Sequence, residues 1–571
     1  VGAEPLLIQR QAGIVIGDQP LDTFVPLTRG NAEEVVSQYA MEPLTELGML
    51  KMDFLGLRNL DVIDDAIVII EKSTGTKIDI GEIPLDDRKT FEMLATGDST
   101  GVFQLESDGM RDAMRKVVPT EFDDITALVS LYRPGAMSEI PRYARGKADP
   151  TTVEYADERL KAITESTYGC FLYQEQLMAV AKEMAGFSPS EADDLRKAIG
   201  KKKRDMMAKM KPAYLEGMTA SGVDSRVANE LWKVNEAAAD YSFNKSHAAC
   251  YALIAYRTAY LKANYPAEYM AAVISSVMST KDKVPFLISR CADMGIKVLP
   301  PDSNTSDHGF IVTDEGIRFG LDAVKNVGYS AVEAMLAARE DKPFDSLWDF
   351  CERVDSRAVN KRAIECLIKC GAFDSLPGSR RGMLEILPEA QAAGQTAQAD
   401  ANLGQGSIFD LDDGGGSAAT VSHHAPISET EFEQKELLSL EKETLGTYLS
   451  SHPLIEVQHA LRAKVDCSIA ELADKKDGSW ATVGGIITDY QKRRTRNGTQ
   501  MMIATLDDIE AQVELLAFNV GESTKARAIE PDAIVIVKGR VDQKEEGTKL
   551  MVQEASVYDP DPEEIANAKK I

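Results

Sequence analysis

The chain has 571 residues, a formal net charge of −27, 44% hydrophobic residues and 27% charged residues. These values indicate several globular domains, and the longest apolar runs are too short to span a membrane. Seven scattered cysteines without a CxxC pair fit a reducing cytoplasm.

The negative charge, taken alone, favours a metabolic enzyme or an acidic scaffold over a nucleic-acid-binding protein. The cations are clustered, however, at Lys201–Arg204, Lys361–Arg362 and Lys492–Arg496. No phosphate loop or redox fingerprint supports a metabolic enzyme. An acidic exterior with basic grooves would confine nucleic-acid binding to those grooves.

Two short segments near the start of the chain predict strands. GIVIGDQPLDTFVPL, residues 13–27, has β-branched runs broken by Gly and Pro. LGMLKMDFLGL, residues 47–57, alternates, so Lys51 and Asp53 should share one face of a strand. A carboxylate beside a lysine at a strand end suits a metal-bound triphosphate, and the alternative is a structural ion pair at the strand edge.

Helical periodicity dominates from Asn59 to about Ile288. The expected helices are Leu60–Lys72, Asp87–Ala95, Asp108–Val117, Phe122–Leu131, Gln174–Met184, Pro189–Ile199, Lys202–Ala220, Ser225–Tyr241 and Ser246–Asn264. Arg133 and either Gln174 or Gln176 are further polar candidates, although each alone is typical of a structural residue.

Six cations lie around the end of the Pro189–Ile199 helix. Ser188, Pro189 and Glu191 predict its start as a capping box, and Gly200 predicts its end. The cations are Arg196, Lys197, Lys201, Lys202, Lys203 and Arg204. They would repel one another unless an anion is near, so the segment predicts a phosphate site; the alternative is a solvated surface run.

A second phosphate site is predicted at YSFNKSHAAC, residues 241–250. We expect Ser246 to cap the helix that follows, with His247 and Tyr251 on one face. Asn244, Lys245, His247 and free backbone N–H groups could hold phosphate, while Tyr251 could face a base or sugar. The alternative is a buried amphipathic helix with a polar cap.

The region after residue 299 predicts a small β-containing piece and a helix-hairpin-helix. Asn326 and Gly328 suit the hairpin, where a glycine would let backbone N–H groups approach a DNA phosphate. NKRAIECLIKCGAF, residues 360–373, predicts a further helix that carries Lys361 and Arg362. From Ser379 to about residue 430 the composition shifts to Ala, Gln, Gly and Ser, which predicts a flexible linker.

The last region has the pattern of an OB-fold. Five apolar runs between Ala481 and Tyr558 predict five strands, with a short helix before the fourth. QKRRTRNGTQ predicts a basic loop between the first two strands, and its cations are Lys492, Arg493, Arg494 and Arg496. Such a loop could contact single-stranded DNA, or it could be a solvated hairpin on a barrel that serves only packing.

These segments, together with LYRPGAMSE (residues 131–139) and YGCFLYQEQLM (residues 168–178), resemble the alpha subunit of bacterial replicative DNA polymerase III, from about Gln9 onward. The resemblance implies a multidomain α+β protein with helical fingers, a helix-hairpin-helix module and a carboxy-terminal OB-fold. It implies template-directed DNA synthesis by two-metal nucleotidyl transfer. It also assigns KMDFLGL to the palm, with Asp53 as the third catalytic and Mg²⁺-binding aspartate and Lys51 as its neighbour.

The family places its other two catalytic aspartates in an earlier D-x-D motif, which this sequence lacks in a suitable strand context. We therefore expect a carboxy-terminal portion, without the phosphoesterase-like domain and most of the palm, that binds but does not polymerise alone. The alternative is a non-enzymatic DNA-binding and clamp-tethering protein. Asp53 separates the two hypotheses, because a tether needs no palm carboxylate.

The resemblance implies a domain order: palm end 1–58, fingers 59–298, helix-hairpin-helix 299–378, linker 379–430, helical connector 431–478, OB-fold 479–559 and acidic tail 560–571. In the linker, Gln405, Ile408 and Phe409 resemble a motif that binds the sliding clamp. The implied partners are primer-template DNA, single-stranded template, deoxynucleoside triphosphates, the sliding clamp and other subunits of the replicative holoenzyme.

Overall fold

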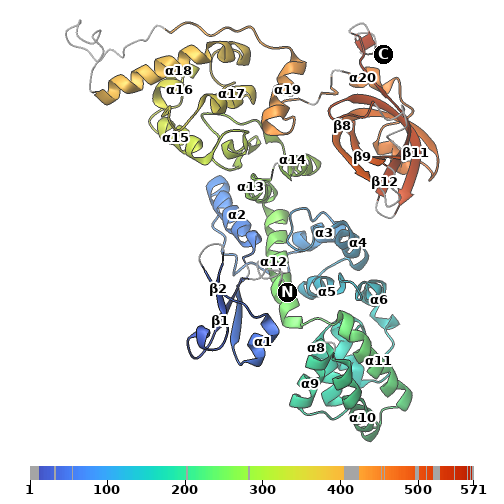
Figure 1. Ribbon diagram of the computed structural model, residues 1–571. Helices are drawn as coiled ribbons and strands as arrows, with labels where there is room; N and C mark the ends of the chain where they lie inside the picture. Colours follow the sequence, from blue (N-terminus) through green and yellow to red (C-terminus); the bar gives the residue numbers. More distant parts are fainter. Residues whose placement is uncertain are drawn as a thin grey trace. The chain divides into compact units, whose positions relative to one another are not determined.

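A computed structural model describes residues 12–30, 34–54, 56–200, 203–280, 283–403, 424–451, 453–455, 457–494, 500–508, 511–518, 528–544, 547–561, 564–565 and 568. The chain forms two compact units, Val1–Asp64 and Asp65–Ile571. Figure 1 shows both units, with labels on many of their helices and strands. No helix in the described part of the chain is long and apolar enough to cross a membrane.

The first unit is built on two small antiparallel sheets. Strand β1 (Ala12–Ile16) pairs with β4 (Leu50–Phe54), so that Lys51 lies opposite Val15 and Asp53 opposite Gly13. Strand β2 (Leu27–Arg29) pairs with β3 (Val35–Ser37), and α1 (Met41–Glu46) precedes β4. The KMDF segment is therefore a strand, as its alternation predicts, and it places Lys51 and Asp53 two residues apart on β4.

The region that helical periodicity marks from Asn59 to about Ile288 is helical from α2 to α14, and α6, α7, α13 and α14 are helices beyond those expected. Its helices are α2 (Arg58–Thr74), α3 (Arg88–Thr96), α4 (Asp108–Val117), α5 (Phe122–Leu131), α6 (Ile140–Ala148), α7 (Arg159–Thr164), α8 (Gln174–Glu183), α9 (Pro189–Gly200), α10 (Arg204–Ala220), α11 (Ser225–Tyr241), α12 (Lys245–Asn264), α13 (Pro266–Ser276) and α14 (Lys283–Asp293). One core gathers α3 to α6 around α12, and a second core gathers α7 to α11.

Helix α12 packs closely on α3 and α5 because its buried face is rich in alanine. The small side chains of Ala252, Ala255 and Ala259 are fully buried there. Tyr256 is also buried, and its hydroxyl donates to the Pro84 carbonyl at 2.6 Å while accepting from the Asp87 N–H at 3.1 Å. These contacts fix the position of α12 against α3 and α5, and therefore the position of its amino-terminal end (Figure 1).

The next region holds a three-stranded sheet and the hairpin helices. Strand β7 (Gly316–Arg318) lies between β5 (Val298–Leu299) and β6 (Ile311–Thr313). The helices are α15 (Tyr329–Arg339), α16 (Leu347–Arg353) and α17 (Lys361–Lys369).

The prediction of a flexible linker from residue 379 is wrong over residues 380–403, which form the long helix α18 (Arg380–Leu403). It packs on α16 and α17 (Figure 1) and buries Met383, Leu387 and Ala390. The Gln398 amide donates to three carbonyl oxygens at the end of α16, at 2.7 to 3.2 Å. Alanine and glutamine favour helix, and this packing supplies the stabilisation that composition alone does not reveal.

Five strands close the carboxy-terminal barrel: β8 (Trp480–Arg494), β9 (Gln500–Asp507), β10 (Gln512–Phe518), β11 (Ile534–Lys544) and β12 (Gly547–Val557). The order β10-β12-β11-β8-β9, with β10 and β12 parallel, confirms the OB-fold. Helices α19 (Gln434–Leu445) and α20 (Gln458–Arg462) precede the barrel.

Residues ahead of the first strand complete the barrel core. Cys467, Ile469 and Leu472 are buried among the strand residues, and we name them the barrel plug. The Ile469 N–H donates to Asp508 at 2.7 Å, and Gln543 donates to the Leu472 carbonyl at 3.1 Å. The structural unit of the barrel therefore begins before residue 479.

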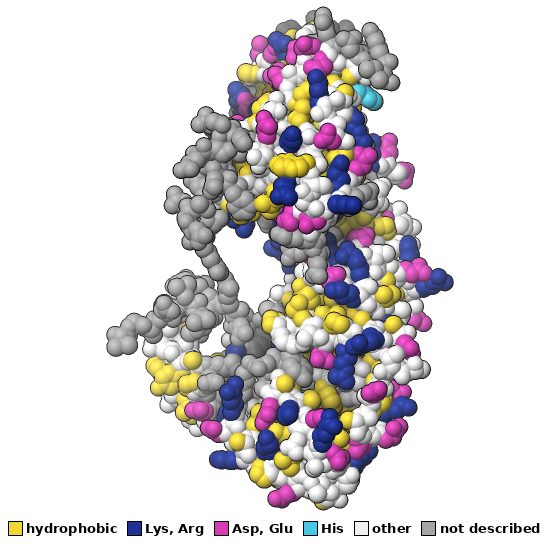
Figure 2. Space-filling model, turned by 90° about the vertical axis from the view of Figure 1, so that its right-hand side faces the viewer, with side chains coloured by type: hydrophobic (Ala, Val, Ile, Leu, Met, Phe, Trp, Pro, Cys, Tyr) yellow, Lys and Arg dark blue, Asp and Glu magenta, His cyan; other side chains and the backbone are white. Residues whose placement is uncertain are grey.

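Charges of both signs lie on the face of the molecule that Figure 2 shows. Figure 2 shows lysine and arginine side chains interspersed with acidic side chains, with apolar patches between them. A site for an anion must therefore be built from particular cations held together by the fold, because the net charge is −27.

Candidate nucleotide and nucleic-acid interface

The start of α12 is capped by Asn244 and not, as we expected, by Ser246. The Asn244 side chain accepts a hydrogen bond from the His247 N–H at 2.9 Å, and the helix begins at Lys245. A short backbone pairing upstream of the helix explains why Asn244 is the cap. The Phe243 N–H donates to the Leu172 carbonyl at 3.0 Å, and the Phe243 carbonyl accepts from the Gln174 N–H at 2.9 Å. This pairing places Asn244, two residues before Ser246, at the turn into the helix.

Two N–H groups at this helix start already donate within the chain, which corrects the expectation that they are free. Both carboxylate oxygens of Glu175 accept from the Lys245 N–H, at 3.0 and 3.1 Å. With His247 bonded to Asn244, two of the first three N–H groups of α12 have acceptors within the chain. Phosphate binding would therefore depend on side-chain cations or on displacement of Glu175.

A row of aromatic rings extends from the helix start along one face of α12. The Phe243 and His247 ring centroids are 5.2 Å apart, those of His247 and Tyr251 are 4.6 Å apart, and those of Tyr251 and Phe103 are 5.5 Å apart. The Arg133 guanidinium lies 4.2 Å from the Phe243 centroid. His247 and Arg133 are exposed, so this row offers flat surfaces that suit a base or sugar.

The cationic end of α9 is partly neutralised by its own helix. Asp193 accepts from Arg196 and from Lys197, each at 2.9 Å. Hydrogen bonds from Lys197, and next from Arg196, lower the pKa of Asp193, while Asp193 raises the pKa of Lys197. Lys203 is exposed at the start of α10, and Lys201 and Lys202 lie outside the described residues.

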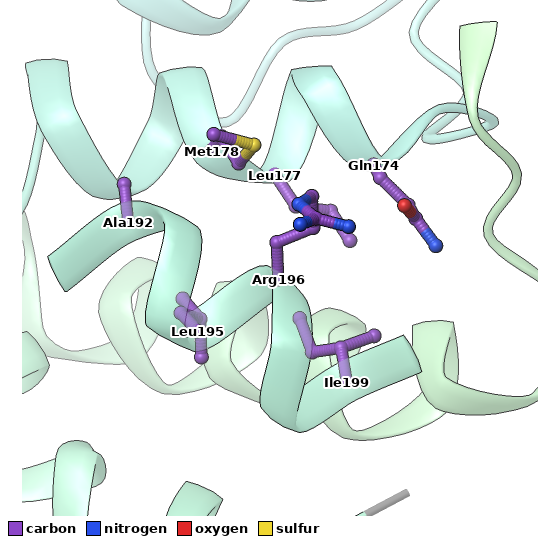
Figure 3. A pocket seen from close by; sticks show the side chains of 7 residues that line it. All are labelled: Gln174, Leu177, Met178, Ala192, Leu195, Arg196 and Ile199. Carbon is purple, nitrogen blue, oxygen red and sulfur yellow. The ribbon is translucent and has the colours of Figure 1, made fainter. Parts of the chain in front are cut away.

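Arg196 also lines a narrow crevice between α8 and α9. Figure 3 shows its guanidinium extending from α9 towards α8, with the Gln174 side chain at the same end of the crevice. The remaining lining is apolar and comprises Leu177, Met178, Ala192, Leu195 and Ile199.

The first turn of α8 connects the two predicted phosphate segments. A Cβ on Gly200, at the end of α9, would lie 3.7 Å from the Gln174 amide nitrogen. Gln174 also pairs with Phe243, and the next residue, Glu175, bonds to Lys245. The Lys245 ammonium lies 5.4 Å from the ring centroid of Tyr173. The structure thus brings the α9 end and the α12 start to one short segment, residues 173–175.

Sequence reasoning missed Tyr173, Glu175 and Phe243 as parts of this arrangement. The YQEQ motif predicted a polar role for Gln174 or Gln176, and no local pattern indicated that Glu175 contacts Lys245. Gln176 is structural: its side chain bonds the Leu172 and Tyr173 N–H groups, each at 2.9 Å.

Lys51 and Asp53 lie on β4 in the other compact unit. Within the described residues, no group of three or more His, Cys, Asp or Glu side chains could hold a metal ion. The Asp53 side chain lies outside the described part of the chain, which gives only its backbone position on β4.

At the hairpin, the backbone conformations of Asn326 and Gly328 differ from those expected: Asn326, and not Gly328, has a positive φ. Asn326 adopts the left-handed conformation with φ 63°, and its amide donates inward to the Cys366 sulfur at 3.3 Å. Gly328 has φ −106°, which any residue can adopt, and caps α15. Lys361 and Arg362 are exposed on the first turn of α17.

The basic segment of the barrel is partly strand rather than loop. Strand β8 continues to Arg494, so Lys492 and Arg493 lie on it, opposite Met502 and Met501 of β9. Both side chains are exposed. The Lys492 ammonium lies 5.5 Å from the Tyr490 ring centroid, and Arg493 donates to Gln491 at 3.0 Å. The Arg494 side chain and Arg496 lie outside the described part, as do Gln405, Ile408 and Phe409.

Comparison with known protein families gives four matches along the chain. Residues 7–56 match the bacterial DNA polymerase III alpha NTPase domain, and residues 59–222 match the bacterial DNA polymerase III alpha subunit finger domain. Residues 295–383 match a helix-hairpin-helix motif, and residues 481–558 match an OB-fold nucleic acid binding domain.

Curated relatives agree with these matches. The chain is 39% identical over 574 residues to the DNA polymerase III subunit alpha of Mycobacterium tuberculosis, covering 98% of this chain and 48% of that protein. It is 40% identical to the Thermus aquaticus protein of the same name and 37% identical to that of Bacillus subtilis, covering 94% and 96% of this chain and 44% and 48% of those proteins. The chain thus spans about half the length of the curated relatives it matches. On the four domain matches and these relatives, the chain belongs to the family of the bacterial DNA polymerase III alpha subunit.

Proposed function

We propose that this chain supplies the nucleotide-binding and DNA-binding part of a bacterial replicative DNA polymerase, which carries out template-directed DNA synthesis in the cytoplasm. The observation that carries the proposal is the meeting of the α9 end and the α12 start at residues 173–175. Cations from two helices beside a row of aromatic rings suit a deoxynucleoside triphosphate, which has a polyanionic end and a flat end.

In this proposal the triphosphate is neutralised by Arg196, Lys197, Lys201, Lys202, Lys203 and Lys245, with Asn244 and His247 beside it. The base or sugar lies against Tyr251. Because Asp193 already engages Arg196 and Lys197, the exposed Lys203 and the Lys245 ammonium should contribute most of the new charge contacts.

The chemistry proposed is two-metal nucleotidyl transfer with Mg²⁺. Asp53 would hold a metal ion together with carboxylates beyond the described residues, and Lys51 would lie beside it. One aspartate cannot hold the two metal ions that nucleotidyl transfer needs. This chain alone should therefore bind its substrates without extending a primer.

The nucleic-acid contacts proposed are distributed over two modules. The hairpin module would hold primer-template DNA through Asn326, Gly328, Lys361 and Arg362. The barrel would hold the single-stranded template through Lys492, Arg493, Arg494 and Arg496.

The protein partners proposed are the sliding clamp and other subunits of the holoenzyme. The clamp would be bound by Gln405, Ile408 and Phe409, and the other subunits would complete the assembly.

The test is nucleotide binding by variants that lose one charge. Lys203→Ala and Lys245→Ala should each weaken dATP binding about tenfold, because each removes a charged phosphate contact of about 1.4 kcal/mol. Isothermal titration calorimetry on the purified chain measures this directly. Lys182→Ala is the matched control, since Lys182 is exposed at the far end of α8.

Primer-template affinity, measured by fluorescence anisotropy, should change little in both variants. Unchanged dATP binding with weakened DNA binding would reassign these lysines to the DNA path and refute the proposed pocket.

A further inference from the structure

Glu175 occupies the place at which an anion would meet the start of α12. Its two carboxylate oxygens accept from one N–H group, that of Lys245, at 3.0 and 3.1 Å. Lys245 is the first residue of α12, where the helix dipole favours negative charge. Glu175 also lies in the first turn of α8, so two helix starts stabilise the same carboxylate.

The position of Glu175 is set by the backbone and not by a mobile side chain alone. The flanking residues Leu172 and Gln174 pair with Phe243 on both sides of the Tyr173–Phe243 bridge. Gln176, the following residue, is anchored by its bonds to the Leu172 and Tyr173 N–H groups. These contacts therefore fix the backbone of Glu175 beside the α12 start, and its side chain reaches the Lys245 N–H from there.

The Lys245 ammonium lies over an aromatic ring. The ammonium lies 5.4 Å from the Tyr173 ring centroid, and among the residues that the structure describes it makes no ion pair with Glu175. A phosphate group approaching Lys245 would meet the negative charge of Glu175. One N–H group cannot donate fully to both anions.

We propose that Glu175 is a specificity-determining residue of the nucleotide site: a carboxylate that holds the start of α12 and is replaced there when a phosphate group binds. This inference deepens the proposed function and rests on it. A single phosphate ion makes too few contacts to displace the Glu175 carboxylate, so the carboxylate excludes it from the α12 start. A triphosphate, with several charged contacts to nearby lysines, can replace it.

The experiment is a titration of the full chain with inorganic tripolyphosphate at low salt, without divalent ions, followed by calorimetry. Glu175→Gln keeps one oxygen able to accept from Lys245 but removes the charge. We expect it to bind tripolyphosphate about fivefold tighter than the unmodified chain, because a repelling charge is lost. Glu183→Gln, which removes the same charge at the exposed far end of α8, should leave binding unchanged.

A merely structural role for Glu175 predicts the opposite sign, since a weakened helix start would bind phosphate less well. Glu175→Gln affinity equal to or below that of Glu183→Gln, with an intact circular dichroism spectrum, would overturn the proposal. If Glu175→Gln unfolds, a crystal structure of the unmodified chain with tripolyphosphate decides the matter. A phosphate oxygen should then accept from the Lys245 N–H, and a Glu175 carboxylate still bonded there would overturn the proposal.

Failure of the underlying pocket has a different signature. If tripolyphosphate binds equally to the unmodified chain and to Lys245→Ala, the pocket itself is misplaced. If Lys245→Ala weakens binding but Glu175→Gln does not strengthen it, the pocket stands and the role of Glu175 is wrong.

Discussion

The basic arm of the barrel, Lys492 and Arg493 on β8, should make single-strand binding depend on salt. Each cation that contacts a phosphate of a single strand adds about 0.7 to the slope of log affinity against log salt concentration. Both side chains are exposed, so replacing both with alanine should flatten the slope by about 1.4. Between 50 and 200 mM salt, the unmodified protein should lose about sevenfold more affinity than the variant.

The assay is fluorescence anisotropy of a labelled oligothymidine at several salt concentrations. The protein should be residues 453–561 rather than the barrel strands alone, because the barrel plug at Cys467, Ile469 and Leu472 belongs to the core. The double variant Lys476→Ala, Lys538→Ala removes two other exposed cations and is the control. An unchanged slope in the arm variant, or an equal change in the control, would refute direct contact by the arm.

Three further predictions test other parts of the proposal. In a full-length polymerase that carries this chain, Asp53→Ala should abolish primer extension and leave primer-template affinity nearly intact; normal turnover would remove Asp53 from the site. Alanine at all three proposed clamp contacts should eliminate clamp association in surface plasmon resonance while clamp-free synthesis persists, and unchanged association would refute that motif. Gly394→Ala should lower stability by about 1–3 kcal/mol in thermal unfolding, because its Cβ would overlap the Cys351 carbonyl oxygen in the contact between α18 and α16. Gly200→Ala, whose Cβ has only ordinary contacts, should be neutral or slightly stabilising, and equal effects of the two would refute the packing argument.

Local signals in the sequence were sufficient for most of the helical region. Phe122–Leu131 and Ser225–Tyr241 begin and end where the periodicity predicts. The second helix starts there because Asp224 accepts from the Arg226 N–H at 2.8 Å, which is a capping interaction between residues two positions apart. The five strands of the OB-fold were equally evident, since each is an apolar run bounded by polar residues.

The errors arise where distant residues decide the local structure. Asn244 and Ser246 are both good caps, and the pairing of Phe243 with residues 172–174 selects Asn244. The contact between Glu175 and Lys245 joins positions 70 residues apart, so no local pattern reveals it. Helix α18 was mistaken for a linker because the bonds of Gln398 to α16 are invisible in composition.

The barrel plug has a consequence for how the barrel forms during protein synthesis. Leu472 leaves the ribosome roughly 85 residues before Val557, the last residue of β12. At about 5–20 residues per second, Ile469 and Leu472 would wait about 4–17 s for the strands that cover them. During that interval the nascent chain carries an apolar segment with no barrel to receive it. A ribosome pause after β12 has left the ribosome would then be harmless, whereas a pause between β8 and β11 would prolong the exposure.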